Sequence, residues 1–173
     1  MRLTYIITAL TLFLTLQTQA QEINWMSWEE AIASSQADAN PKKIFVDVYT
    51  DWCGWCKKMD ANTFANPKVA AYMNENFYMV KFDAEGTAPV EYKGKTFQFR
   101  KQGRNGVHEL AYALLQGKLS YPSVVFLNEK QELIAPVPGY REPKEFLEIA
   151  RFFGDDIFTH TKWADYQTKN SNK

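Results

Sequence analysis

The sequence predicts an α/β domain built on a single central mixed β-sheet with helices on both faces. Two runs, 43–49 and 78–83, are apolar at nearly every position, which is typical of strands buried in the middle of a sheet. Two later runs, 123–127 and 132–137, are separated only by a tight turn, and this spacing predicts an antiparallel pair. Helical patterns lie between the other strands, so helices are expected to cover both faces of the sheet.

Composition and charge are those of an ordinary globular protein. The chain has 173 residues, of which 46% are apolar and 23% are charged, and this is enough for one domain with a proper core. Lys and Arg together number 20, as do Asp and Glu, so the formal net charge is zero. Because the chain has no basic stripe, nucleic acid is not an expected partner.

The start of the chain differs in kind from the rest. Arg2 precedes an apolar stretch over 5–16, and small residues lead to Ala20. This pattern predicts a secretory signal peptide over 1–20, which leaves 21–173 as one mature domain with its core over about 44–153. A retained membrane anchor is the alternative, but the apolar stretch is shorter than the roughly 20 residues that span a bilayer.

Three helices are expected in the first half of the chain. Ser27 to Glu30 form a capping box, which predicts a helix from 28 to about 39. The next helix begins at the cysteines and runs to about 60–63. Asn66-Pro67 then supply the cap and the first residue of a third helix.

The second half is less regular. Residues 91–97 predict a short hairpin, and 107–116 predict a helix. Pro143 opens a last helix to about 153. The stretch 155–173 is polar with scattered aromatic residues, and we expect it to pack in part and to fray from 168 onwards.

The only two cysteines, Cys53 and Cys56, form a C-x-x-C motif directly after the apolar run 44–49. A strand that leads into C-x-x-C at the start of a helix is typical of thiol–disulfide redox chemistry. A structural staple is the alternative, but so short a loop gains little stability from closure. Unpaired N–H groups and the helix dipole favour the thiolate of Cys53 and lower its pKa, so Cys53 is the expected nucleophile. Cys56, one turn further on, is the expected resolving thiol.

The segment Val46–Lys57 resembles the active-site segment of the thioredoxin family almost position by position. Asp47 stands six residues before Cys53, where thioredoxins carry a buried acid, and Lys81 falls where they place a lysine. The resemblance implies that Asp47 lies beneath Cys56 and exchanges a proton with it, with a pKa raised by burial and opposed by Lys81. An acid exposed at a strand edge is the alternative.

The segment Tyr121-Pro122-Ser123 resembles the thioredoxin segment that places a cis-proline opposite the disulfide, and Gly139 matches the glycine after the last strand. The resemblance runs from about 44 to 152 and implies a thioredoxin fold. A cis bond at Pro122 would present the backbone of Tyr121 to an extended substrate segment. An ordinary trans strand opener is the alternative.

Two features depart from thioredoxin. Gly54-Trp55 replaces the Gly-Pro of its motif, and residues 87–117 form a hairpin-plus-helix insertion before the cis-proline strand. The segments Trp28–Ala31 and Cys56–Met59 are more similar to exported thioredoxin-like proteins of bacteria. That similarity implies a periplasmic protein and a membrane electron donor.

The residues around the motif suggest a substrate groove formed by Trp52, Gly54, Trp55 and Tyr121. The two tryptophans offer an apolar landing surface for the cysteine loop of a partner protein. Packing at the edge of the core is the alternative for Trp52, whereas Trp55 is expected to be exposed.

No cofactor is expected, and a metal site is a poor alternative. The two cysteines with His108 and His160 would supply four ligands, but the histidines lack the spacing of a zinc site. His108 is expected on the surface of its helix.

The expected function is that of an exported thiol–disulfide oxidoreductase acting on disulfide-containing client proteins. Gly54-Trp55 offers neither charge nor imidazole to stabilise the thiolate, which favours a reductase over an oxidase or isomerase using the same residues. A second alternative is a non-catalytic binding or assembly module that presents Trp55 and residues 87–117 to a partner.

Overall fold

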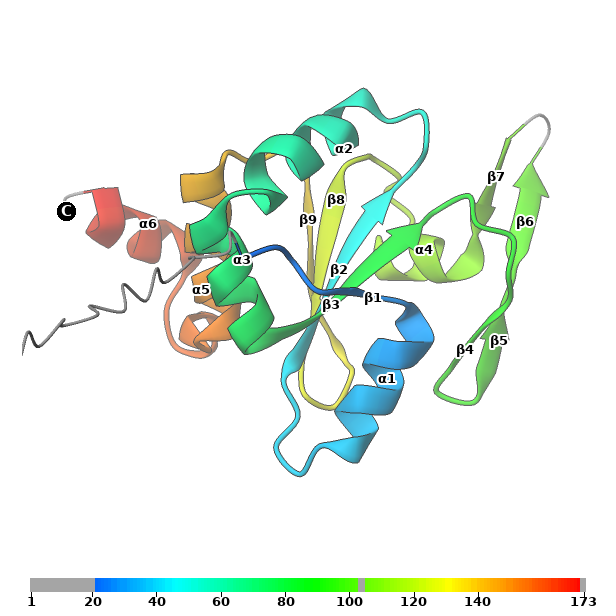
Figure 1. Cartoon of the computed structure of the whole chain (residues 1–173), viewed down its shortest axis with the longest axis horizontal. Coiled ribbons are helices and arrows are strands. Elements are labelled where there is room, and N and C mark those ends of the chain that lie inside the picture. The colour runs from blue at the N-terminus through cyan, green and yellow to red at the C-terminus, as the bar shows by residue number, and fades with distance from the viewer. Residues whose placement is uncertain (1–20, 103–104, 172–173) are drawn as a thin grey trace, which may run out of the picture.

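The computed structural model describes residues 21–102 and 105–171 (Figure 1). The predicted signal peptide lies outside these residues. Within them, no helix has both the length and the apolar character needed to cross a membrane.

The centre of the molecule is a mixed sheet, as predicted, and it has five strands (Figure 1). Its strands, in spatial order, are β1 (Trp25–Met26), β3 (Phe77–Asp83), β2 (Lys43–Tyr49), β8 (Ser123–Leu127) and β9 (Leu133–Pro138). The first three are parallel to one another, and β8 and β9 run antiparallel to their neighbours. The short strand β1 was not among the predicted elements. The predicted strand β2 therefore lies in the middle of the sheet, with neighbours on both edges.

Helices cover both faces of this sheet. One face carries α1 (Trp28–Ala37) and α4 (Glu109–Leu114), and the other carries α2 (Gly54–Met59), the π-helical turn η1 (Asp60–Phe64), α3 (Pro67–Asn76) and α5 (Pro143–Gly154). Because side chains alternate along a strand, Val46 faces the first layer whereas Phe45 and Asp47 face the second. Asp47 therefore lies on the face of the sheet that carries α2.

The predicted caps of α1 and α3 are confirmed. Ser27 Oγ accepts the N–H of Glu30 at 3.1 Å, and the Glu30 carboxylate accepts the N–H of Ser27 at 2.8 Å. Asn66 Oδ1 accepts the N–H of Lys68 at 3.0 Å, with Pro67 at the first helical position. These local hydrogen bonds fix where the helices begin.

The insertion contains two hairpins instead of one. The predicted hairpin is β4 (Val90–Tyr92) with β5 (Lys95–Phe97), and β6 (Phe99–Gln102) with β7 (Asn105–His108) follows it. The prediction of a helix over 107–116 was wrong at its start, because 105–108 pairs with β6 and α4 begins only at Glu109. Figure 1 shows both hairpins projecting from one side of the central sheet.

His108 lies in the core, and its predicted place on a helix surface was wrong. Its side chain is buried at the junction of β7 and α4. Nδ1 accepts the N–H of Leu110 at 3.1 Å and Nε2 lies 3.1 Å from the carbonyl oxygen of Ala88. Because its ring also packs edge-on to Phe82 of β3 at 5.1 Å, His108 links the insertion to the central sheet.

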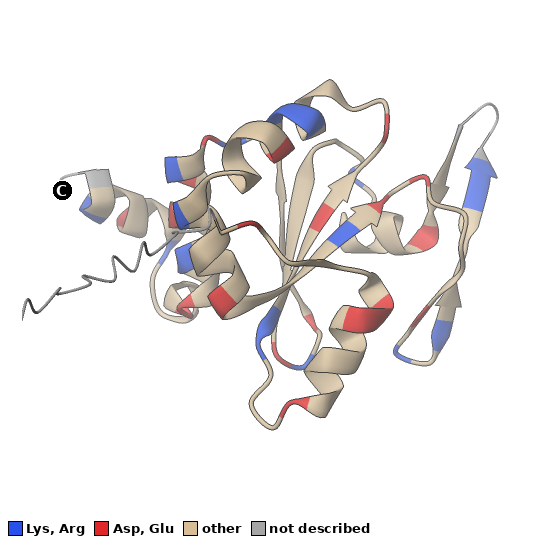
Figure 2. Ribbon diagram, viewed as in Figure 1, with Lys and Arg blue, Asp and Glu red and all other residues tan. Residues whose placement is uncertain are grey.

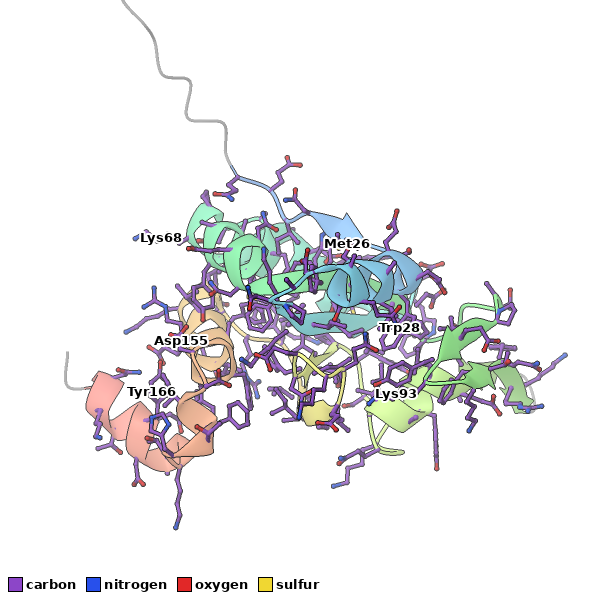
Figure 3. The ribbon with its side chains drawn as sticks, turned by 90° about the horizontal axis from the view of Figure 1, so that it is seen from below. Met26, Trp28, Lys68, Lys93, Asp155 and Tyr166 are labelled. Carbon is purple, nitrogen blue, oxygen red and sulfur yellow. A yellow bond between two sulfur atoms is a disulfide. The ribbon has the colours of Figure 1, made fainter. Side chains whose placement is uncertain are left out.

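The C-terminal stretch is more ordered than predicted. It forms η2 (Ile157–Thr159) and α6 (Trp163–Ser171), so the fraying expected from 168 is wrong up to Ser171. The rings of Trp163 and Tyr166 pack on Phe152 of α5 at 5.0 and 5.3 Å. Figure 3 shows Tyr166 and Lys93 of the first hairpin near opposite ends of the molecule.

Charges of both signs are spread over the ribbon, and neither is confined to one layer (Figure 2). This distribution agrees with the zero formal net charge of the sequence.

Candidate active site

Cys53 and Cys56 form a disulfide at the start of α2, with their Cα atoms 5.3 Å apart. Cys53 is the N-cap residue, and its Sγ accepts the backbone N–H of Cys56 at 3.0 Å. The same N–H is available to a thiolate on Cys53 in the reduced protein. Cys53 is 5% exposed and Cys56 is 3% exposed, so the disulfide is recessed.

Asp47 lies on β2 in register with Lys81 of β3. The residue is 2% exposed, which excludes the alternative of an acid at an exposed strand edge. Its Oδ2 lies 3.6 Å from Lys81 Nζ, whereas its Oδ1 has no hydrogen-bond partner within the described protein. Loss of hydration on burial raises the pKa of Asp47 to about 7; the Lys81 ammonium opposes this rise, and the negative charge of Asp60 adds to it.

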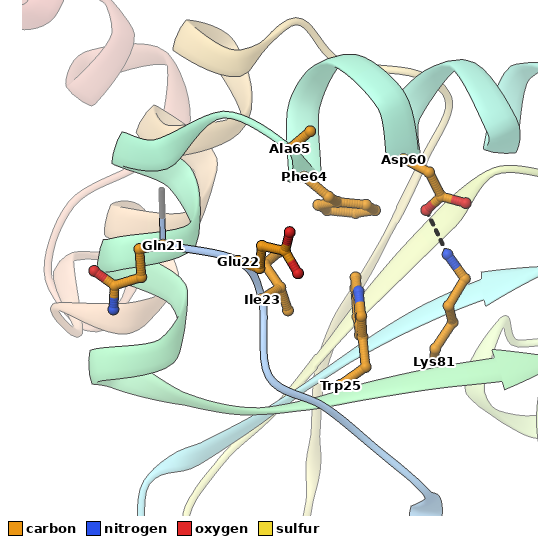
Figure 4. Close-up of a pocket in the computed structure, with 8 residues that line it drawn as sticks. All are labelled: Gln21, Glu22, Ile23, Trp25, Asp60, Phe64, Ala65 and Lys81. Atoms are coloured by element: carbon orange, nitrogen blue, oxygen red, sulfur yellow. Dashed lines mark hydrogen bonds and ion pairs between the residues drawn. The ribbon is translucent and has the colours of Figure 1, made fainter. Parts of the chain in front are cut away.

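Asp60 belongs to this charge cluster and was missed by the sequence analysis. Its Oδ1 contacts Lys81 Nζ directly, so one lysine serves two carboxylates (Figure 4). Lys81 also lies over the ring of Trp25, 5.1 Å from its centroid. The spacing in the sequence could have indicated this position, because Asp60 follows Cys56 by four residues and such residues lie on the same side of a helix.

A cavity of about 430 Å³ opens beside this ion pair (Figure 4). Trp25 and Phe64 form aromatic walls, and the lining also includes Asp60 and Lys81. The side chain of Lys81 is partly exposed there, whereas Asp47 behind it is not. The ion pair thus lies between the buried acid and solvent.

The peptide bond between Tyr121 and Pro122 is cis, as expected. The carbonyl oxygen of Pro122 accepts the N–H of Gly139 at 2.8 Å. Gly139 has φ +92°, a backbone conformation that glycine adopts readily. The loop after β9 is therefore joined to the start of β8 by a backbone hydrogen bond.

Both tryptophans of the motif region are exposed, Trp52 to 66% and Trp55 to 57%. Packing at the core edge is therefore wrong for Trp52. Its indole N–H donates to Glu85 at 3.1 Å, and its ring meets Tyr121 edge-on at 5.9 Å. A Cβ on Gly54 would meet nothing within 4 Å, so the surface between the tryptophans is open.

The described residues 21–102 and 105–171 contain no group of three His, Cys, Asp or Glu side chains arranged to hold a metal ion. Both ring nitrogens of His108 are engaged in hydrogen bonds within the fold.

The central sheet, the cysteine pair at the start of a helix and the cis-proline together define a thioredoxin fold that carries a C-x-x-C pair. Residues 6–145 match the family model Thioredox_DsbH, whose description is "Protein of unknown function, DUF255". Because this match covers most of the chain, the protein belongs to that family. The prediction of a thioredoxin-like protein is confirmed.

Two relatives and one solved structure illustrate the similarity. An uncharacterized protein of Caenorhabditis elegans is 32% identical over 91 residues, which are 53% of this chain and 12% of that protein. The disulfide bond reductase DsbH of Chlamydia pneumoniae is 28% identical over 102 residues, which are 57% of this chain and 61% of that protein. The solved structure of a DsbH oxidoreductase is 18% identical and aligns with a TM-score of 0.54. The alignment covers 78% of this chain and 85% of that chain and shows that the two share a fold. The chain spans less than two thirds of the length of either relative.

Proposed function

We propose that the protein is an exported reductase of protein disulfides that uses the Cys53–Cys56 dithiol. The observation that carries the proposal is the position of Cys53 at the N-cap of α2, where its sulfur accepts a backbone N–H. Such a hydrogen bond favours the thiolate, which is the reactive form of cysteine.

The reaction proceeds in two exchange steps. The thiolate of Cys53 attacks one sulfur of a client disulfide, and a mixed disulfide forms as the first client thiolate leaves. The thiolate of Cys56 then attacks the sulfur of Cys53, closing the 53–56 disulfide and releasing the second client thiolate. Two electrons pass to the client, and its two thiolates take up two protons.

Asp47 is the proposed proton acceptor for Cys56. Its pKa of about 7 allows it to exchange a proton near neutral pH, and it lies on the face of the sheet that carries α2. Lys81 and Asp60 adjust this pKa in opposite directions. The cavity beside Lys81 offers the proton a route to solvent.

Pro122 and Tyr121 are proposed to hold the client chain. The cis bond supports a backbone at Tyr121 that is available to an extended segment. Trp52, Gly54 and Trp55 form the remaining part of the groove, and the open space beside Gly54 supports close approach of a client backbone.

The reductase direction rests on two observations. The residues between the cysteines, Gly54 and Trp55, bring no charge or imidazole that would stabilise the thiolate further. The similar protein from Chlamydia pneumoniae bears the name of a disulfide bond reductase. An oxidase or isomerase using the same residues is the competing function.

Export rests on the composition of residues 1–20, and residues 21–173 are proposed to form one thioredoxin-like domain in the bacterial periplasm. A periplasmic reductase needs a source of electrons, and the proposed source is a membrane protein that presents a dithiol. N-terminal sequencing of the protein from a periplasmic extract tests export, since cleavage after Ala20 leaves Gln21 first.

The reduction of insulin by dithiothreitol tests the activity. We expect the protein to accelerate precipitation of the insulin B chain and Cys53→Ser to abolish that acceleration. A reduction potential near thioredoxin's, about −270 mV, supports a reductase, and one near about −120 mV overturns the direction. Trapping with Cys56→Ser captures clients as mixed disulfides. A cellular role that survives in Cys53→Ser would instead indicate a non-catalytic binding module.

A further inference from the structure

Three side chains form a wall beside the disulfide, which we call the Trp55 wall: Trp55 and Lys58, which are exposed, and Tyr140, which is half-buried. The two rings lie 5.4 Å apart at an interplanar angle of 44°. The ammonium of Lys58 is 4.9 Å from the centroid of Trp55 and 5.0 Å from that of Tyr140. A cation therefore lies on an aromatic surface next to the reactive sulfurs.

Hydrogen bonds fix the outer part of this wall. The hydroxyl of Tyr140 donates to Glu142 at 2.9 Å and accepts from Asn62 Nδ2 at 2.6 Å. Asn62 also donates to the second oxygen of Glu142 at 2.7 Å. Because Tyr140 follows Gly139, whose N–H binds the carbonyl of Pro122, the wall is connected to the cis-proline segment. Because these hydrogen bonds already order the Tyr140 side chain, binding of a client costs little further side-chain entropy there.

Lys58 is the charged residue of the wall, and its ammonium can form an ion pair with a partner. It forms no salt bridge with any residue in 21–102 or 105–171. The nearby carboxylate of Glu142 is already engaged by Tyr140 and Asn62. Glu85 is the carboxylate bound by the Trp52 indole, and Trp52 contacts Tyr121. Tyr140 and Asn62 are neutral, so Glu142 keeps its negative charge near Lys58. Because Lys58 forms no ion pair with it, the Lys58 ammonium remains available to a client carboxylate.

We propose that the Trp55 wall selects client segments that are extended and carry a carboxylate close to the reactive cysteine. The carboxylate pairs with Lys58 while a neighbouring apolar side chain of the client packs on Trp55. This inference rests on the proposed function and names the class of client that the same site prefers. An extended segment fits because it can pair with the backbone of Tyr121 while its side chains reach the wall.

Competition between two peptides tests the proposal. Both carry the same apolar sequence and one intermolecular disulfide, with Glu flanking the cysteine in one peptide and Lys in the other. The rate at which each peptide is reduced is divided by the rate at which the same protein reduces hydroxyethyl disulfide, a small neutral disulfide. Differences between variants in the reactivity of the Cys53 thiol then cancel. We expect the protein to prefer the Glu peptide about fivefold, as a partly exposed ion pair allows, and this preference to shrink in about 0.5 M salt.

Variants of the wall distinguish it from general charge effects. Lys58→Glu is expected to reverse the preference, and Trp55→Ala to slow both peptides about tenfold relative to hydroxyethyl disulfide. Lys57→Glu is the matched control on the same helix and should retain the preference for the Glu peptide. Equal peptide rates in the unmodified protein, or a preference unchanged in Lys58→Glu, overturn this inference alone. A protein that reduces neither peptides nor hydroxyethyl disulfide overturns the proposed function as well.

Discussion

Replacing Asp47 with Asn removes the carboxylate that the fold buries at the centre of its sheet. Burial raises the pKa of Asp47 from 3.8 to about 7. At about 1.4 kcal/mol for each pKa unit, this shift corresponds to about 4 kcal/mol by which the ionised carboxylate destabilises the folded protein. This cost makes Asp47→Asn a stabilising substitution at alkaline pH.

The sign of the pH dependence follows from proton binding. Between pH 4 and pH 7 the folded protein holds a proton on Asp47 that the unfolded chain has lost. The contribution of Asp47 to the free energy of unfolding therefore falls as pH rises through this window and is constant above it. In Asp47→Asn this fall is absent. The free energy of unfolding of the variant should therefore exceed that of the unmodified protein by up to about 4 kcal/mol at about pH 8.5, and by little at about pH 4.5.

Urea unfolding of the oxidised protein at both pH values measures this difference. The matched control is Asp51→Asn, because Asp51 is an exposed acid near the same site. Asp51→Asn should change the free energy of unfolding by no more than about 0.5 kcal/mol at either pH. A stability gain for Asp47→Asn that is the same at both pH values, or larger at the acid one, would refute the reasoning.

Three further perturbations have defined outcomes. Asp60→Asn removes a negative charge, and Lys81 then pairs with Asp47 alone, so the pKa of Asp47 should fall. NMR titration of the carboxyl group measures this pKa, and an unchanged value contradicts the shared-lysine arrangement. His108→Ala leaves buried hydrogen-bonding groups unpaired and should cost about 2–3 kcal/mol, with faster amide exchange in β4–β7 than in β2; uniform exchange would argue against a local link. Ser27→Ala should lower the free energy of unfolding by about 1 kcal/mol in denaturant, and no loss would mean that the capping box is dispensable.

Much of the fold followed from local patterns in the sequence. The capping box at Ser27, the buried run Lys43–Tyr49 and the hairpin over 91–97 each lie where predicted. Their determinants are hydrogen bonds to near neighbours, side-chain periodicity and backbone preferences, all of which a short window of sequence contains. The boundary of α4 was misplaced because strand pairing with β6, a non-local interaction, competes with the helical pattern of 107–116.

The sequence alone determined which residues are the candidates for the proposed chemistry: two cysteines one helical turn apart after a buried strand, with Asp47 on that strand. Only the tertiary structure decided the partners of these groups. Lys81 is shared with Asp60, Tyr140 lies against Trp55, and His108 is buried against Phe82 of the central sheet. The physical reason is that charge and ring contacts depend on distances of a few ångströms between segments far apart in the chain, and chain folding sets those distances.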